Sequence, residues 1–421
     1  MKIKLPYGRI HITLELEKLN IKIITSKKVD AIENLRAALI NKLQNPAESP
    51  PLKKLAGKAG EILVVIPDKT RAFPSKLILP EVLQTIKEAN PNAKIKILIA
   101  TGLHKPHTHK EIFEIVGKEI FRNYEVSSHN AEDPSTTVNL NRKTSYGTPV
   151  IVNGEVMKSD LVIGLGLIEP HFFAGYSGGR KTILPGVAGK EAIYMNHSYR
   201  MITHPNARYG FLSGNPVHED MVEFMKMTKL DFIVNVTING EKKVTGIFCG
   251  DPIKAHIQGA KFLNSYAKVQ VMEKADIAIV TNGGYPLDRN LYQAVKGMAT
   301  GEQVVKKGGV IVIVAECKEG LGGHEEFHDI FLKAKNPDDV DRIIRKMEPI
   351  KDQWEAQILA RILKKATVIA VTDMNQSTLE DMLIKPASNI EEALQEARRI
   401  VGKNSPNIVV VPEGPYIIPE S

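Results

Sequence analysis

The chain has 421 residues, which is too long for one ordinary hydrophobic core, so two domains are expected. Hydrophobic residues make up 43% and charged residues 25%, as in soluble globular proteins, and no apolar run reaches the ~18–20 residues of a membrane span. The net charge of +8 comes from dispersed lysines without a nucleic-acid-binding motif, which argues against a nucleic-acid partner and favours small anionic ligands.

The two cysteines predict an intracellular redox environment. Cys249 and Cys317 form no CxxC motif and no disulfide framework, so reduced, buried thiols are expected. The first residues alternate in polarity rather than forming an apolar block, so no signal peptide is predicted. We therefore expect a cytoplasmic protein.

The first part of the chain predicts an α/β domain. It begins with short antiparallel strands at 10–16 and 21–24, and Asp30 is expected to cap a helix that runs to Leu43. Continuous apolar runs predict buried parallel strands at 62–66, 95–100, 161–166 and 232–238. Amphipathic runs predict helices at 74–89, 110–116, 216–226 and 253–266. Residues 148–153 and 155–157 predict a hairpin that closes at Asn153-Gly154.

A second α/β unit is predicted after a boundary near residues 265–273. Its expected strands are 277–280, 310–314 and 368–371, and its expected helices are 291–299, 338–346 and 390–401. The expected fold is two α/β domains with mainly parallel sheets and an active-site cleft between them. The predicted domains are residues 1–268, which would bind the cofactor, residues 269–405, which would clamp the substrate, and a tail, 406–421, whose strand could return to the first domain.

A glycine-rich segment, GYSGGRKT at 175–182, is the centre of the predicted site. It fails the P-loop pattern, and the nearby Gly164-Leu165-Gly166 fails the dinucleotide-binding pattern. The glycines could let backbone N–H groups wrap a phosphate, or could form only a tight structural turn. Lys181 is a candidate nucleophile, because a like charge at Arg180 would lower the pKa of its amine.

Histidines supply the candidate acid, base and metal ligands. His104 lies just beyond a predicted strand end and is a candidate acid/base, as is His171, which two phenylalanines would shield from water. His104, His107 and His109 could alternatively bind zinc, although Pro106 interrupts helical spacing. His197 is a weak candidate for a nickel, copper or zinc ligand.

Other polar residues could bind an anionic group. Asp68 and Arg71 follow a predicted strand, and arginine can bind a carboxylate or phosphate with two hydrogen bonds. Gln293 and Lys296 share one helical face beside Tyr292, although an exposed amphipathic helix would explain this pattern equally well. Trp354, the only tryptophan, is either a core residue or a lid over the pocket.

Six segments together resemble the lactate racemase (LarA-like) family, whose members use a nickel-pincer nucleotide. The matching segments, in order along the chain, are DKTR at 68–71, TGLHKPHT at 101–108, EPHFFAGYSGGRKTILPGVAG at 169–189, NHSYR at 196–200, GNPVHED at 214–220 and YQAVKG at 292–297. The resemblance covers essentially the whole chain, and its central motif is specific to this family.

The resemblance implies a racemase or epimerase of 2-hydroxy acids, with lactate as the first candidate substrate. Lys181 would carry the cofactor, a pyridinium-3-thioamide-5-thiocarboxylic acid mononucleotide with nickel, and His197 would bind the metal. His104 and His171 would be the two acid/bases. The remaining implied contacts are with the cofactor, from Asp68, Arg71, Ser177, Gly178 and Gly179, and with the substrate, from Arg71, Tyr292, Gln293, Lys296 and Trp354.

The resemblance also implies partners, which are a small 2-hydroxy acid and the cofactor-biosynthesis proteins that load the enzyme. Two other classes stay open at this stage. One is a zinc hydrolase built on His104, His107 and His109. The other is a non-catalytic phosphate- or nucleotide-binding protein built on the glycine segment.

Overall fold

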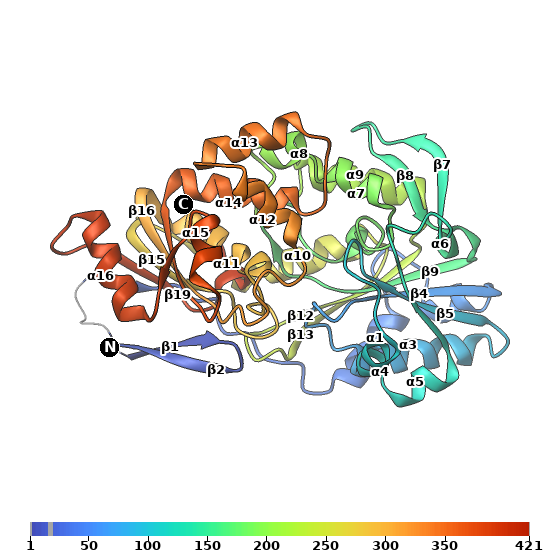
Figure 1. The fold of residues 1–421 in the computed structure, drawn as a ribbon. Helices are drawn as coiled ribbons and strands as arrows, with labels where there is room; N and C mark the ends of the chain where they lie inside the picture. The colour runs from blue at the N-terminus through green and yellow to red at the C-terminus, as the bar shows by residue number, and fades with distance from the viewer. Residues whose placement is uncertain (1, 16–19, 421) are drawn as a thin grey trace. The chain divides into compact units, whose positions relative to one another are not determined.

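The computed structural model describes residues 2–15 and 20–420. The chain forms two compact units, each built around one mainly parallel six-stranded sheet (Figure 1). The first unit holds Lys28–His197 and His204–Ser265, and the second holds Met1–Lys27, Ser198–Thr203 and Tyr266–Ser421. The predicted class, two α/β units with mainly parallel sheets, is confirmed. Within the described ranges, no helix has both the length and the apolar character that crossing a membrane requires.

The sheet of the first unit has the strand order β13-β12-β9-β4-β5-β6. Neighbouring strands run parallel, except for the antiparallel pair β12 and β13. The strands are β4 (Glu61–Pro67), β5 (Lys94–Ala100), β6 (Glu125–Ser128), β9 (Leu161–Leu167), β12 (Phe232–Ile238) and β13 (Val244–Gly250). Every residue of β9 and β12 is buried, which explains their unbroken runs of nonpolar residues.

Helices α1 to α5 of this unit bury apolar residues in one core with the sheet. The helices of the unit, in chain order, are α1 (Leu35–Gln44), α2 (Leu52–Ala56), α3 (Ser75–Ala89), α4 (His109–Val116), α5 (Lys118–Asn123), α6 (Gly154–Lys158), α7 (Lys190–Asn196), α9 (Pro216–Met227) and α10 (Lys254–Ala267). Leu39 of α1, Leu52 of α2 and Ile78 of α3 belong to one core with alternate residues of β4. This core holds the carboxyl ends of the strands in fixed positions, and the candidate site residues follow those ends.

The predicted start of the first helix is wrong. Helix α1 begins at Leu35, and its cap is Asn34, whose side chain accepts a hydrogen bond from the N–H of Ala37. Asp30 lies in the irregular segment before it. Both residue types cap helices well, so the capping preference did not distinguish them.

The predicted hairpin at 148–157 is also wrong. β8 (Pro149–Asn153) pairs antiparallel with the preceding strand β7 (Thr137–Lys143). Residues 154–158 form helix α6, because the Asn153 side chain caps it by accepting from the N–H of Glu155. The polar sequence of β7 hid the true partner, since most of its side chains are exposed.

The sheet of the second unit has the order β18-β17-β16-β15-β19-β3, with all strands parallel. The strands are β3 (Ile21–Ile23), β15 (Ala275–Thr281), β16 (Val305–Val314), β17 (Thr367–Val371), β18 (Lys385–Ala387) and β19 (Ile408–Val411). The antiparallel hairpin of β1 (Lys2–Tyr7) and β2 (Ile10–Glu15) shares a core with α16 (Ile390–Val401) and the sheet. Helices α11 (Leu291–Val304) and α14 (Gln353–Lys365) also contact the sheet.

The observed units differ from the predicted division at both ends of the chain. β3 runs parallel to β19 and not antiparallel to its chain neighbours, so residues 20–27 lie in the second unit. The strand at 408–411 pairs with β15 in the same sheet and does not return to the first unit. The end of the first predicted strand, Leu16, lies outside the described residues. The functional division, with a cofactor-binding and a substrate-binding domain, stays a prediction.

Candidate active site

Asp68 and His104 follow two neighbouring strands, β4 and β5, and form a close pair. The Asp68 carboxylate is buried, and its Oδ2 lies 2.6 Å from Nδ1 of His104, while Thr70 donates its hydroxyl to Oδ1 at 2.6 Å. Burial alone would raise the pKa of Asp68, but the His104 imidazole and the hydrogen bond from Thr70 outweigh it and hold the pKa below its usual range. Asp68 therefore orients the His104 ring, a role that the sequence did not reveal.

Arg71 also lies at this edge of the first sheet. Its Nη1 donates to Oε1 of Glu169 at 3.0 Å. A hollow of about 310 Å³ opens beside it, and its lining includes Asp68, Arg71, Lys76 and Glu114. The predicted roles of Asp68 and Arg71 as cofactor or substrate contacts stay predictions, and Glu169 is a partner that the sequence reading did not single out.

His171 ends the two-residue strand β10 (Pro170–His171), which pairs with the two-residue strand β11 (Gly175–Tyr176). Its ring is buried against the rings of Phe172 and Phe173, with centroid distances of 5.1 and 4.5 Å. The N–H of Ala174 donates to its Nδ1 at 3.3 Å. The expected shielding of His171 by two phenylalanines is therefore present.

Three candidate residues surround the ring of Phe173. The Lys181 Nζ lies 5.6 Å from the ring centroid and 3.3 Å from Nε2 of His171. His197 packs edge-on against the same ring at 5.0 Å. The fold thus brings together His171, Lys181 and His197, which the sequence separates by up to 26 positions.

His197 ends helix α7 and is buried, with a side chain that is 4% exposed. Burial, followed by the charge of Lys181, lowers the pKa of His197 well below its ordinary value. The imidazole is therefore neutral, and neutral imidazole is the form that binds a metal ion.

Polar groups of the glycine-rich segment at 175–182, called the glycine bend below, form hydrogen bonds with other parts of the protein. Gly178 and Gly179 have φ angles of 77° and 54°, which favour glycine, and the N–H of Gly179 donates to Oδ1 of Asn235 at 2.8 Å. The Ser177 hydroxyl donates to the Leu167 carbonyl at 2.6 Å. The prediction that this bend binds a phosphate gains no support from these contacts. Asn235 is a polar residue within the buried strand β12, and that signal could have revealed its role.

Arg180 holds the bend together. Its side chain is 1% exposed and donates to the carbonyls of Ala174 at 2.7 Å, Tyr176 at 2.8 Å and Gly178 at 3.2 Å. Burial lowers its pKa to about 9. The sequence predicted that Arg180 acts as a second cation beside Lys181. In the structure, its guanidinium binds backbone carbonyls instead.

The three histidines of the zinc alternative have different partners. His104 contacts Asp68, Nδ1 of His107 lies 3.3 Å from the Ser128 hydroxyl, and His109 packs edge-on against Phe121. Among the described residues, no group of three or more His, Cys, Asp or Glu side chains is arranged to hold a metal ion. The geometry therefore gives the zinc hydrolase no support.

Four predicted substrate residues, Tyr292, Gln293, Lys296 and Trp354, form a second cluster within the second unit, whereas the fifth, Arg71, lies in the first unit. Lys296 of α11 donates its Nζ to Oε1 of Gln293 at 2.5 Å, and Trp354 of α14 donates Nε1 to the Tyr292 hydroxyl at 2.9 Å.

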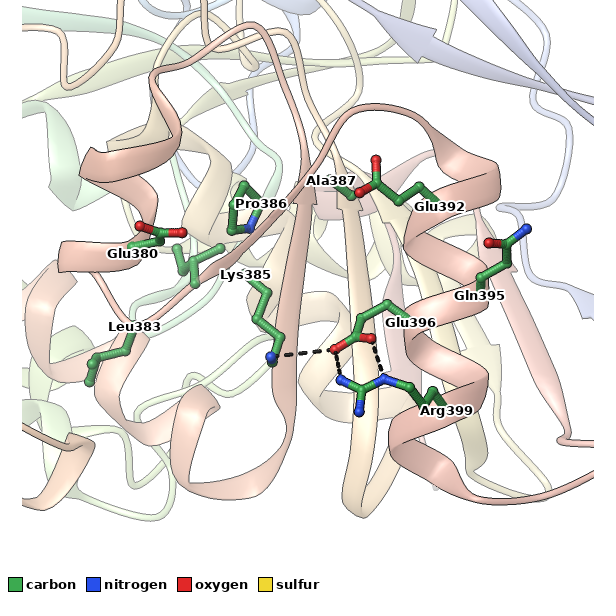
Figure 2. Close-up of a pocket in the computed structure, with 10 residues that line it drawn as sticks. Glu380, Leu383, Lys385, Pro386, Ala387, Glu392, Gln395, Glu396 and Arg399 are labelled. Carbon is green, nitrogen blue, oxygen red and sulfur yellow. Dashed lines mark hydrogen bonds and ion pairs between the residues drawn. The ribbon is translucent and has the colours of Figure 1, made fainter.

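A separate hollow of about 770 Å³ lies along β18 and α16, where Figure 2 shows Glu396 bound to Lys385 and Arg399. None of the predicted site residues lines that hollow.

The fold and the side chains around Phe173 define the class as an α/β enzyme in which a lysine and two buried imidazoles lie around one phenylalanine ring. Two family models match the chain. The lactate racemase N-terminal domain matches residues 7–210, and the lactate racemase C-terminal domain matches residues 270–418. The chain therefore belongs to the lactate racemase family, whose members are isomerases and generally need a nickel cofactor.

Individual relatives agree with this assignment. The chain is 41% identical to a lactate racemase of Thermoanaerobacterium thermosaccharolyticum, over 99% of this chain and 98% of the relative. It is 38% identical to a lactate racemase of Lactiplantibacillus plantarum, over 99% of both chains. The solved apoprotein of the lactate racemase from T. thermosaccharolyticum superposes with a TM-score of 0.95, at 39% identity and full coverage of both chains.

A more distant structure shares only the fold. A protein from Thermotoga maritima superposes with a TM-score of 0.70 at 17% identity, over 88% of this chain and 96% of that one. This match supports the two-unit α/β architecture and carries no information about the reaction.

Proposed function

We propose that the chain is a lactate racemase, or a racemase or epimerase of a close 2-hydroxy acid, that uses a nickel-pincer nucleotide held covalently by Lys181. The proposal rests mainly on one observation, which is that the side chains of His171, Lys181 and His197 all lie around the Phe173 ring. The family membership makes lactate the first candidate substrate.

The residues present fit such a cofactor. Lys181 offers a primary amine beside an imidazole, and His197 offers a buried neutral imidazole that packs against the same phenylalanine. His197 would hold the nickel of such a cofactor through a ring nitrogen, because imidazole is a suitable ligand for nickel. When bound, the cofactor would supply the acceptor and donor of a hydride.

Hydride transfer explains why the reaction needs such a cofactor. Removing the α-proton of a 2-hydroxy acid would place negative charge next to a carboxylate that is already negative. Loss of hydride from C2 instead gives a planar 2-keto acid, to which hydride can return on either face. The protein then has to move only the hydroxyl proton and hold the substrate in place.

His104 and His171 are the proposed acid/bases. Asp68 holds Nδ1 of His104 and so orients the ring whose Nε2 would take the hydroxyl proton of one enantiomer. His171 would act on the other enantiomer from its buried position. Positioned general bases of this kind each contribute roughly 10²–10⁴-fold to a rate.

The substrate carboxylate needs cations. Lys296 and Arg71 are the proposed partners, with Tyr292, Gln293 and Trp354 completing the substrate site. Lys296 is bound by Gln293, and Arg71 by Glu169, so both cations are oriented by neighbouring side chains. This assignment, the cytoplasmic location and the need for cofactor-loading proteins belong to the proposal.

A racemisation assay tests the proposal. The protein is produced together with the cofactor-making proteins and nickel, and is assayed against a panel of chiral 2-hydroxy acids. We expect lactate or a close homologue to racemise, and a Lys181→Ala protein prepared in parallel to be inactive. If the loaded wild-type protein racemises no 2-hydroxy acid, the proposed function is wrong.

A further inference from the structure

The substrate-binding face proposed for the second unit begins at the first turn of α11. Asn290 caps this helix by accepting a hydrogen bond from the N–H of Gln293, which fixes where Tyr292 and Gln293 lie on it. Both side chains are buried. The orientation of the Tyr292 hydroxyl is therefore set by the groups that pack around it.

Trp354 is one of these groups. It lies in the first turn of α14 and donates Nε1 to the Tyr292 hydroxyl at 2.9 Å. Because the hydroxyl accepts from Trp354, its own proton is available to a carboxylate, and a hydrogen bond with Asp352 is among the causes that raise the pKa of Tyr292.

A buried His–Asp pair lies against the same tyrosine. The His324 ring stacks on the Tyr292 ring with a centroid distance of 3.7 Å and an interplanar angle of 5°. Nδ1 of His324 lies 2.7 Å from Oδ2 of Asp352, and these two side chains are 9% and 3% exposed. A histidine–carboxylate pair removed from water in this way fixes the orientation of the ring.

Asp352 is placed by an unusual backbone conformation. Its φ angle is +63°, in the left-handed region, and it directly precedes helix α14. Aspartate and asparagine tolerate this region better than most residues. The carboxylate is therefore presented from a rigid helix start, two residues before Trp354.

Burial changes the titration of two side chains in this cluster, Glu355 and Tyr292. Burial raises the pKa of Glu355 well above its ordinary value, although the positive charge of Lys296 acts in the opposite direction. Burial and the charge of Asp352 also raise the pKa of Tyr292 well above its ordinary value. Burial therefore favours the neutral form of both side chains.

We propose that His324 and Asp352 are positioning residues that fix the ring and hydroxyl of Tyr292 for the substrate, through the stack of His324 on Tyr292 and the hydrogen bond between His324 and Asp352. The inference rests on the proposed function, because Tyr292 is taken to contact the 2-hydroxy acid. It adds two residues, 28 positions apart, that neither the motifs nor the family match single out.

Kinetics of the loaded, full-length enzyme test the role. Asp352→Asn keeps the shape and the left-handed backbone, and His324→Phe keeps the stack but loses the hydrogen bond. We expect each to raise KM for lactate by about tenfold, as for a lost hydrogen bond to a charged group, with a smaller change in kcat. In a Tyr292→Phe protein, Asp352→Asn should add little, because the hydroxyl on which the pair acts is already absent.

The surface pair His328 and Asp381 provides a matched control. Nε2 of His328 lies 3.2 Å from Oδ2 of Asp381, whose side chain is 45% exposed. Asp381→Asn should leave KM and kcat unchanged. Unchanged KM in Asp352→Asn and His324→Phe, or full additivity with Tyr292→Phe, would overturn the inference.

Trp354 gives a second readout that needs no turnover, because it is the only tryptophan and contacts Tyr292. Lactate binding is followed by Trp354 emission, and the Kd should rise about tenfold in Asp352→Asn but not in Asp381→Asn. If the wild-type protein binds lactate but racemises no 2-hydroxy acid of the panel, the proposed function fails while these Kd values still decide the inference. If no 2-hydroxy acid of the panel binds the wild-type protein, both fail.

Discussion

The Nζ of Lys181 lies 3.3 Å from Nε2 of His171. On the other side of the same ring, Nδ1 accepts a hydrogen bond from the N–H of Ala174. In the neutral imidazole this acceptor role places the ring proton on Nε2, facing the lysine nitrogen. The imidazole therefore lies within hydrogen-bonding distance of the lysine nitrogen, and the free amine is the form of a lysine that attacks an electrophilic carbon.

The first prediction concerns covalent attachment. When the cofactor-making proteins are supplied, intact-mass analysis should show an adduct, and peptide mapping should place it on Lys181. A Lys190→Ala protein is a suitable control, because this lysine begins the next helix in the same segment. An adduct that persists in Lys181→Ala would contradict the assignment.

The second prediction concerns the metal. His197→Ala should lose nickel and keep the adduct, because only the imidazole donor is removed. Nickel is measured by elemental analysis and the adduct by mass. His204→Ala, which changes an exposed histidine seven residues later, should keep both. Stoichiometric nickel in His197→Ala would remove the role assigned to His197.

The third prediction concerns the two acid/bases. His104→Ala and His171→Ala should keep the cofactor and lose racemisation by roughly 10²-fold or more, since each removes one positioned base. His107→Ala, a neighbour whose ring lies near Ser128, should stay active. Full racemisation in either of the first two proteins would end the two-base scheme.

The fourth prediction follows from the lowered pKa of Asp68. The unfolded chain protonates this group near pH 3.9, and the folded protein does so at lower pH, so the carboxylate stabilises the fold above about pH 4. This stabilisation is lost as the pH falls through the folded-state pKa. Asp68→Asn should therefore melt below the wild type at pH 6, and the difference should shrink as the pH falls below 4. A difference that does not depend on pH would contradict the pairing with His104.

The fifth prediction concerns Arg180. Arg180→Met keeps much of the volume but leaves the carbonyls of Ala174, Tyr176 and Gly178 without their donor, which should destabilise the protein by about 3 kcal/mol. Arg399→Met removes an exposed ion pair with Glu396 and should cost at most about 1 kcal/mol. Denaturant unfolding measures both, and equal stabilities would contradict the role of Arg180.

Much of the fold could be predicted because burial leaves a direct trace in the sequence. The runs that became β9 and β12 contain almost no charge, and their limits were predicted to within one or two residues. β7 was missed because its side chains are mostly exposed and its sequence is polar. Pairing between the chain ends was also missed, since short apolar strands such as β3 do not specify their partner.

Candidate site residues could be proposed from the sequence where their chemistry is unusual for a core. A lysine and a histidine close to a glycine bend marked Lys181 and His171. The partner of each residue was not predictable, because contacts such as Asp68 with His104 depend on the order of strands in the sheet. The cleft expected between the two domains stays a prediction.

Arg180 has a chemical consequence for the lysine next to it. Between Gly175 and Gly189 the chain has one primary amine, Lys181, and the adjacent cation is a guanidinium enclosed by carbonyl oxygens. An acylating reagent that reaches this loop meets a single nitrogen able to react. Because this loop contains one primary amine, acylation is expected to form one amide-type linkage, and its position is Lys181.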